Sequence, residues 1–286
     1  MKWEGGRESD NVEDRRGSGG GGFGGKTVGI GTIVIALVGS YIFGVDPSTV
    51  LEVIGGGGGS GVQQEGPAGP PANDRDSKFV RTVLADTEDA WGALFRAQGA
   101  AYQPPTLTLF TGRVPTACGT GQSASGPFYC PGDQKVYIDL SFFRLMKERF
   151  NVAGDFAQAY VIAHEVGHHV QHLMGTSQKM QQARSQGSEA QVNAMSVRME
   201  LQADCYAGVW AYHTDQKRKI LEGGDVEAAL KAATAIGDDA LQRQGGGEVV
   251  PDSFTHGTSA QRARWFSKGL ENGQVEGCNT FDTRNL

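Results

Sequence analysis

Residues 28–45, VGIGTIVIALVGSYIFGV, contain no charged side chain over 18 positions. A helix of this length spans roughly 27 Å, which is close to the thickness of the hydrocarbon core of a bilayer. A chain must either bury such a segment in a large core or place it in a membrane. The segment lacks periodic polar positions and has glycine-rich flanks, which disfavours a buried core helix. No A-x-A cleavage site follows it, which disfavours a cleaved signal peptide.

The flanks of this segment predict the domain organisation. Residues 1–26 carry five basic and five acidic side chains and little to bury, so we expect them to be disordered. Lys and Arg precede the segment and neither follows it before Arg75, and the positive-inside rule then places the N-terminus in the cytoplasm. We predict a single-pass membrane protein that contacts the lipid bilayer through residues 28–45. Its parts are a cytoplasmic segment (1–26), a transmembrane anchor (27–46), a Gly/Pro-rich linker (47–76) and an extracytoplasmic domain (77–286).

The charge balance excludes one class of partner. The chain has 26 basic and 32 acidic residues, a net charge of -6, and no dense basic cluster in its folded part. General nucleic-acid binding requires concentrated Lys and Arg, so we expect no nucleic-acid partner. The sequence does not indicate the oligomeric state.

The four cysteines form no C-x-x-C pair, which disfavours a cysteine-based structural zinc site. An even number in a domain expected outside the membrane favours disulfides. Cys118 and Cys130 bracket a Gly- and Ser-rich loop that a cross-link would close, and we expect that pair. Cys205 and Cys278 are then the remaining pair, with a buried free thiol at Cys205 as the alternative.

The hydrophobic patterns predict an α+β domain in which a small N-terminal sheet precedes a helical half. Apolar residues recur with helical spacing over 79–95, and strands are expected at 106–111, 128–130 and 136–140. A helix is expected over 157–173. Further helices should begin after Ser188, Asp225 and Thr258, where S-E-A-Q and T-S-A-Q fit capping boxes at the first and last of these positions.

The expected helix at 157–173 carries the sequence AHEVGHH at residues 163–169. His164 and His168 are four residues apart, so they project from one helix face at a spacing that lets two imidazoles share a Zn²⁺ ion. Glu165 lies between them, where it can act on a metal-bound water. H-E-x-x-H can also occur by chance with solvated side chains, but this helix is largely apolar, and a buried polar turn without a partner is costly. His169 and His172 are expected to face other directions, at the surface or behind the ligands.

A second expected helix supplies a third ligand. Catalytic zinc sites usually have three protein ligands and one open position. Glu200 and Asp204 are four apart on one face, among apolar or small neighbours. We predict Glu200 as the third ligand and Asp204 as a group that holds the far nitrogen of a ligating histidine. An exposed acidic pair on a helix surface is the alternative.

His256 precedes the last expected helix, and Arg262 lies within that helix. An imidazole at a helix start can donate a hydrogen bond to an oxyanion that forms during acyl transfer. An ordinary loop histidine is an equal alternative at this position.

These motifs resemble known zinc peptidases. H-E-x-x-H followed by E-x-x-x-D resembles the gluzincin class, and T-H-G-x-x-x-x-R at 255–262 resembles the T-H-P-x-x-x-x-R element of membrane-bound CAAX-type proteases, with Gly257 replacing Pro. GPFYCP, VYIDL, AHEVGHHVQ, ELQADCYAGVW and THGTSAQRARWF together are similar to the bacterial putative neutral zinc metallopeptidase family over residues 77–282 and the N-terminal anchor. The resemblance implies a zincin-like domain, zinc on His164, His168 and Glu200, and Glu165 as the base. It extends to His256 and Arg262.

We therefore expect a membrane-tethered zinc metalloendopeptidase that hydrolyses peptide bonds of a peptide or protein substrate through a metal-activated water. An edge strand, either 106–111 or 136–140, would hold the substrate in extended form. The alternative is a catalytically silent membrane-tethered zinc-binding or scaffold module, against which Glu165 argues because a structural site does not need it. A latent protease with the 118–130 loop over its cleft is a third reading that the sequence does not decide.

Overall fold

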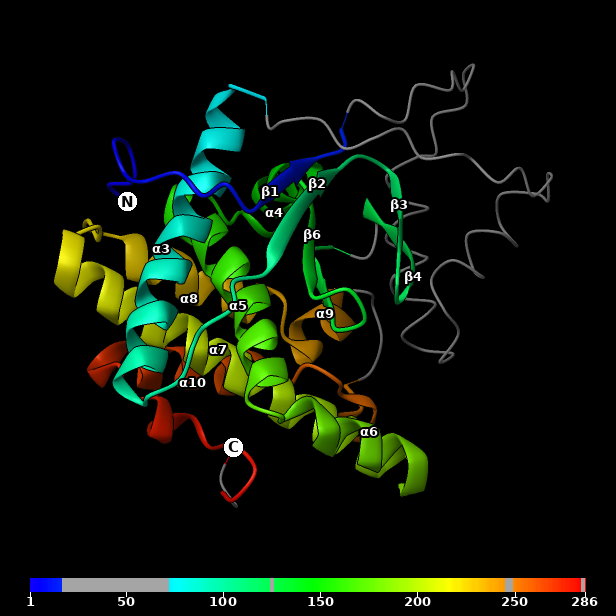
Figure 1. Cartoon of the computed structure of the whole chain (residues 1–286). Helices are drawn as coiled ribbons and strands as arrows, with labels where there is room; N and C mark the ends of the chain where they lie inside the picture. The colour runs from blue at the N-terminus through cyan, green and yellow to red at the C-terminus, as the bar shows by residue number, and fades with distance from the viewer. Residues whose placement is uncertain (17–71, 124–125, 245–248, 284–285) are drawn as a thin grey trace, which may run out of the picture.

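The computed structural model describes residues 1–16, 72–123, 126–244, 249–283 and 286. A small sheet lies beside a bundle of helices in these residues (Figure 1). Most of the strands precede residue 140 and most of the helices follow it. The architecture is therefore mixed α/β with a small N-terminal sheet and a helical C-terminal half, as the hydrophobic patterns predict.

The main sheet has the strand order β1-β2-β6-β5 within the described part of the chain. β1 and β6 run parallel to β2, whereas β5 runs antiparallel to β6. Side chains alternate across it, so Leu107 and Val136 enter the main core while Tyr137 enters a smaller cluster on the other face. The strands are Val12–Asp14 (β1), Thr106–Phe110 (β2), Lys135–Asp139 (β6) and Phe128–Cys130 (β5), and a separate hairpin pairs Arg113–Thr116 (β3) with Gly119–Gln122 (β4).

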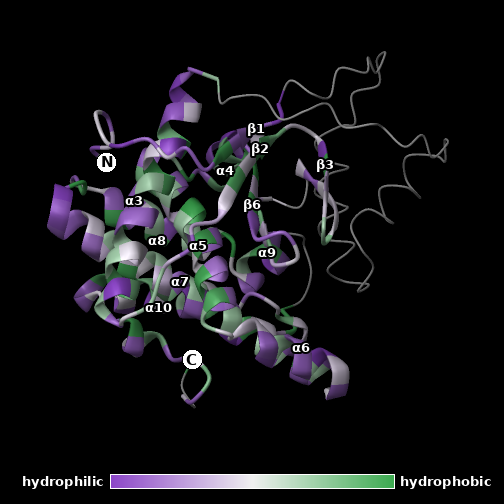
Figure 2. Cartoon of the chain, viewed as in Figure 1, coloured by the Kyte–Doolittle hydropathy of each residue, from purple (hydrophilic) through white to green (hydrophobic). Residues whose placement is uncertain are grey.

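Helix α5 (Asp155–Leu173) lies at the centre of the molecule and is buried over most of its surface. It packs against α3, α7 and α8 and against the β5–β6 side of the sheet. The other helices are Arg75–Ala97 (α3), Ser141–Phe150 (α4), Ser177–Gln186 (α6), Glu189–Arg218 (α7), Asp225–Ala235 (α8), Asp238–Gln244 (α9) and Ser259–Asn272 (α10), with 3-10 turns at Pro251–Ser253 (η2) and Val275–Cys278 (η3). Helix α6 buries no residue and is largely hydrophilic in Figure 2.

The expected helix starts are confirmed at two sites. Ser188 caps α7 and Thr258 caps α10, each in a full capping box with a glutamine three residues later. These boxes satisfy backbone N–H groups that the first helical turn leaves without partners. The local sequence therefore determines where α7 and α10 begin.

Two glycines set the close crossing of α7 and α10. A Cβ atom at Gly208 would collide with the carbonyl oxygen of Phe266, and one at Gly269 would collide with that of Cys205. The backbones can approach only because neither position has a side chain. This crossing brings the start of α10, and with it Arg262, to the inner face of α7.

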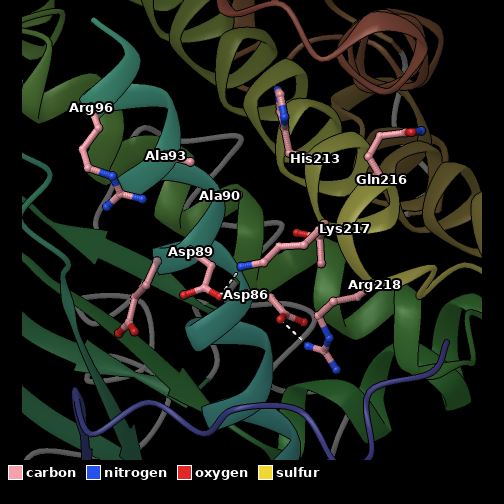
Figure 3. A pocket seen from close by; sticks show the side chains of 11 residues that line it. Asp86, Asp89, Ala90, Ala93, Arg96, His213, Gln216, Lys217 and Arg218 are labelled. Carbon is pink, nitrogen blue, oxygen red and sulfur yellow. Dashed lines mark hydrogen bonds and ion pairs between the residues drawn. The ribbon is translucent and has the colours of Figure 1, made fainter. Parts of the chain in front are cut away.

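Ion pairs at the surface join α3 to the end of α7 (Figure 3). Lys217 Nζ lies 2.9 Å from Asp89 Oδ2, and Arg218 pairs with the buried carboxylate of Asp86. The groove between them has a volume of about 490 Å³ and lies away from the histidines of α5. The two ion pairs join α3 to α7, and no histidine of α5 lines this groove.

The prediction of disorder at residues 1–26 is wrong for residues 1–16. β1 pairs with β2, and Trp3 is buried in the core with its ring at 5.4 Å from that of Phe79. Trp3 Nε1 donates to Asp155 Oδ2 at 2.8 Å, and Lys135 Nζ pairs with Glu13 Oε1 at 2.8 Å. The charges that suggested disorder have partners on the folded domain.

The predicted single-pass membrane topology is also wrong. In the portions of the chain that the structure describes, no helix has the length and apolar character needed to cross a bilayer. Residues 1–16 share one sheet and one core with residues 75–283. A single crossing between these two parts would place them on opposite sides of a membrane. The predicted span at 28–45 lies outside the described residues, as does most of the predicted linker.

The disulfide prediction is confirmed, and the edge-strand prediction is wrong. Cys118 is bonded to Cys130 and Cys205 to Cys278, which excludes a free thiol at Cys205. The strands expected at 106–111 and 136–140 are β2 and β6, both of which lie inside the sheet. Strand β5 forms the edge next to α5.

Candidate metal centre

The AHEVGHH sequence lies in the middle of α5, and the ELQAD sequence lies on the facing side of α7. The two helices approach closely at Gly167, where an added Cβ would be 3.0 Å from the carbonyl oxygen of Ala203. Gly167 stands between the two histidines, and Ala203 stands between Glu200 and Asp204. The glycine therefore allows the carboxylates of α7 to reach the imidazoles of α5.

Three side chains converge at this crossing. His164 Nε2 lies 3.2 Å from Glu200 Oε2, and His168 Nε2 lies 3.4 Å from Glu200 Oε1. One ligand atom from each of the three residues lies within 4.8 Å of the other two. The side chains of His164, His168 and Glu200 are 7%, 17% and 16% exposed, so the cluster is partly accessible to solvent.

Asp204 holds the far nitrogen of His164. Its Oδ1 lies 2.8 Å from His164 Nδ1 and accepts from the hydroxyl of Tyr160 at 2.5 Å. Arg262 donates to the same carboxylate from Nε at 2.8 Å and from Nη2 at 3.0 Å. All four side chains are buried. Burial raises the pKa of Asp204, but the Arg262 and His164 charges outweigh burial and lower the pKa below its usual value.

Hydrogen bonds at the far nitrogens orient the rings of both histidines. Asp204 is an ionised acceptor, so His164 Nδ1 donates to it, and Nε2 is the ring nitrogen that faces Glu200. His168 Nδ1 lies 2.9 Å from Gln171 Oε1 and donates in the same way. The Nε2 atoms of two imidazoles thus face an anionic carboxylate, an arrangement that stabilises positive charge, whether carried by protonated imidazole or by a metal ion. Two imidazoles and a carboxylate are also the donor set of many catalytic zinc sites, so these residues fit Zn²⁺.

The pKa values of His164 and Glu200 also indicate that the cluster stabilises positive charge. Burial lowers the pKa of His164, but the Asp204 and Glu200 carboxylates outweigh burial and raise the pKa to about 10. Burial raises the pKa of Glu200, but the His168 charge and the hydrogen bond from His164 bring the pKa well below its usual range. The site therefore attracts a cation and keeps Glu200 ionised.

Glu165 follows His164 directly and is 7% exposed. Burial raises its pKa above the usual value, and the charges of His168 and His164 offset only part of this effect. A carboxylate with a raised pKa holds a proton more readily than a free carboxylate, which suits a group that takes up and releases protons.

His256 lies in the loop that enters α10. Asp238 Oδ2 accepts from the backbone N–H groups of Thr255, His256 and Gly257 at 2.8, 2.6 and 2.9 Å, and Asp238 Oδ1 lies 3.1 Å from His256 Nδ1. Partial burial lowers the pKa of His256, whose side chain is 46% exposed, but the hydrogen bond with Asp238 and the charge of Glu200 outweigh this effect and raise the pKa. The imidazole is therefore oriented, with its Nε2 pointing away from Asp238.

Gly257 distinguishes the T-H-G sequence of this loop from the T-H-P element that it resembles. Its backbone has φ of 88°, in the left-handed region. Proline cannot adopt this angle because its ring holds φ near −65°. The loop that carries His256 thus has a backbone that a T-H-P sequence could not form.

His169 is not a surface group, which was one of the roles open to it. It is fully buried, with Nε2 donating to the carbonyl oxygen of Gln103 at 2.7 Å and Nδ1 lying 3.1 Å from the hydroxyl of Tyr129. Burial lowers its pKa to about 4. His169 therefore stays neutral and ties α5 to strand β5. His172 is partly exposed beside the Tyr129 ring.

Three residues of this centre were not predicted from the sequence. Tyr160 is one turn before His164, and Gln171 is three residues after His168, so helical spacing could have indicated both. Asp238 lies 18 residues before His256, and only the tertiary structure brings the two together.

Residues 1–281 match a family described as "Putative neutral zinc metallopeptidase". The chain is 51% identical over 290 aligned residues to the "Uncharacterized protein YpfJ" of Escherichia coli (strain K12), covering 98% of this chain and 99% of that protein. It is 40% identical over 220 residues to the "Uncharacterized protein Rv2575" of Mycobacterium tuberculosis (strain ATCC 25618 / H37Rv), covering 73% of each. No solved structure matches the chain significantly.

Proposed function

This chain belongs to the putative neutral zinc metallopeptidase family, and on that premise we propose that it hydrolyses peptide bonds with Zn²⁺ held by His164, His168 and Glu200. The observation that carries the proposal is the convergence of two imidazole nitrogens and a carboxylate oxygen within 4.8 Å of one another. A zinc ion in such a site makes water more acidic and polarises a carbonyl group.

Glu165 is the proton-transfer group in this proposal. Its carboxylate takes a proton from the attacking water and later delivers that proton to the nitrogen of the leaving amine. Its raised pKa supports both steps, because the group must accept and then release a proton. Asp204 acts through His164, whose ring it orients with Tyr160 and Arg262 behind it.

His256 is proposed to stabilise the oxyanion. Asp238 fixes the ring and favours its protonated form, so Nε2–H can donate to a carbonyl oxygen that becomes negative. The charge of Glu200 contributes to the raised pKa of His256, which supports a position beside the metal centre.

Strand β5 is proposed to bind the substrate backbone. It is an edge strand, and its Tyr129 contacts His169 of the metal-binding helix. An extended peptide can add to such an edge through main-chain hydrogen bonds. We therefore propose that the substrate binds at β5 and not at β2 or β6, which lie inside the sheet.

Glu165→Gln tests the proposal. The variant should retain one zinc per chain, because Glu165 is not a ligand, and should lose activity by about 10²–10⁴-fold. Zinc content is measured by atomic emission, and cleavage is followed with fluorescent casein and with a mixture of unstructured peptides analysed by mass spectrometry. Glu148→Gln on the exposed face of α4 is the matched control and should match the parent.

Two results would contradict the proposal. Equal cleavage by the parent and by Glu165→Gln would exclude Glu165 as the base. A parent that binds zinc at the three ligands but cleaves none of the peptides, with or without added chelator, would favour a silent zinc-binding module.

A further inference from the structure

The two histidines of the centre are supported by different chemistry. His164 donates to an anionic carboxylate that two further side chains hold. His168 donates instead to Oε1 of Gln171, a neutral amide that is fully buried. A neutral acceptor gives a weaker hydrogen bond than a charged one. The orientation of His168 therefore depends on how firmly Gln171 itself is held.

Gln171 is held by an extended chain of amides. Its Nε2 donates to the carbonyl oxygen of Met199 at 2.7 Å and to Oε1 of Gln202 at 3.1 Å. A carbonyl oxygen can only accept, so the amide of Gln171 must present Nε2 to Met199 and Oε1 to His168. Nε2 of Gln202 then donates to the carbonyl oxygen of Cys278 at 3.0 Å. The chain of hydrogen bonds thus runs from α5 through α7 to η3.

The far end of this chain is covalently attached to α7. Cys278 forms its disulfide with Cys205, which directly follows Asp204. Two residues further on, Thr280 Oγ1 donates to the carbonyl oxygen of Arg198, and the Arg198 guanidinium donates back to the Thr280 carbonyl oxygen. The segment after α10 is therefore fastened to the side of α7 that faces away from the metal centre.

We propose that Gln171 and Gln202 are positioning residues that keep His168 in its metal-binding tautomer, and that the Cys205–Cys278 disulfide holds the end of this amide chain. The proposal rests on zinc binding at the proposed site. It assigns a role in metal affinity to the C-terminal segment, which contributes no ligand. It also explains why an uncharged pair of amides is buried between α5 and α7, where unpaired polar groups would be costly.

Gln171→Met and Gln202→Met test the two amides, because methionine fills a similar volume and accepts only weak hydrogen bonds. Zinc dissociation constants are measured by competition with a chromogenic chelator. The absorption spectrum of the Co²⁺-loaded protein reports the ligand geometry directly. We expect affinity to fall about 10–100-fold for Gln171→Met and by a smaller factor for Gln202→Met, with an altered Co²⁺ spectrum in both. Gln158→Met, on the same helix and partly exposed, is the matched control and should bind as the parent does.

The disulfide is tested with paired alanine variants. Cys205→Ala with Cys278→Ala should weaken zinc binding, whereas Cys118→Ala with Cys130→Ala removes the other cross-link and should leave affinity near that of the parent. Thermal unfolding of the metal-free proteins identifies any variant that has lost its fold, and the remaining variants then decide the result.

The outcomes separate the two proposals. A parent that binds no zinc contradicts the proposed function and this inference with it. A parent that binds zinc, together with folded Gln171→Met and Gln202→Met variants of unchanged affinity and Co²⁺ spectrum, overturns this inference alone. Equal loss of affinity in both disulfide variants would remove the role of the Cys205–Cys278 bond.

Discussion

Trp3→Ala is expected to destabilise the whole domain, although Trp3 lies in a segment whose composition suggests disorder. The side chain is 6% exposed, packs against Phe79 and donates to Asp155. A buried aromatic side chain covers about 150–250 Å², which at about 25 cal/mol per Å² corresponds to about 4–6 kcal/mol as an upper estimate. Large-to-small substitutions of this kind cost about 3–5 kcal/mol. We expect the free energy of unfolding to fall by about that amount.

The measurement is guanidinium chloride unfolding followed by near-ultraviolet circular dichroism. Trp3→Phe keeps a ring against Phe79 but loses the indole N–H donor, so we expect a loss of about 1–2 kcal/mol. The exposed neighbour Lys2→Ala is the control and should change stability by less than about 0.5 kcal/mol. If Trp3→Ala behaved like Lys2→Ala, residues 1–16 would not be part of the core, and the placement of β1 in the sheet would be refuted.

Three further predictions follow from buried contacts. Asp204→Asn should weaken zinc binding about 10–100-fold, measured by chelator competition, and an unchanged affinity would show that His164 does not depend on it. Burial raises the pKa of Asp14, but hydrogen bonds from Arg16 and from a backbone N–H outweigh it and lower the pKa below its ordinary 3.8. The parent should therefore be more stable than Asp14→Asn at pH 7, and this difference should disappear as the pH falls through 3.8 and below. Urea unfolding at several pH values measures the difference, and a difference that does not change with pH would contradict the pairing of Asp14 with Arg16. Gly208→Ala should cost about 1–3 kcal/mol or more because its Cβ meets the Phe266 carbonyl, and a thermal midpoint equal to that of the parent would argue against the close helix crossing.

Much of the fold was predictable because its elements are locally encoded. The helical spacing of apolar residues predicts α3, α5 and α7, and the capping boxes at Ser188 and Thr258 define helix starts to the residue. Short elements with weak patterns were missed, among them β1, the β3–β4 hairpin, α4, α6 and α9. Three or four residues give too few repeats to show a period, and α6 has no buried face to produce one.

The prediction of disorder at residues 1–16 was wrong because it rested on the composition of that segment alone. Residues 1–16 are polar and precede a glycine-rich stretch, so their composition predicts disorder. Their partners, such as Lys135 for Glu13 and Glu222 for the Met1 amino group, lie more than 100 residues away. No local pattern reveals ion pairs of this kind. The same long-range pairing decides that β5, rather than β2 or β6, forms the sheet edge.

Local sequence is sufficient to identify the residues that offer metal ligands, since turn spacing places His164 and His168 on one helix face and Glu200 and Asp204 on another. That spacing is a property of any α-helix and needs no partner. The contact between these two faces depends instead on packing, because it requires the close approach of Gly167 and Ala203. Packing also fixes which ring nitrogen of each histidine faces the centre, because Asp204 reaches His164 from α7 and the Met199 carbonyl of α7 orients the amide of Gln171 toward His168.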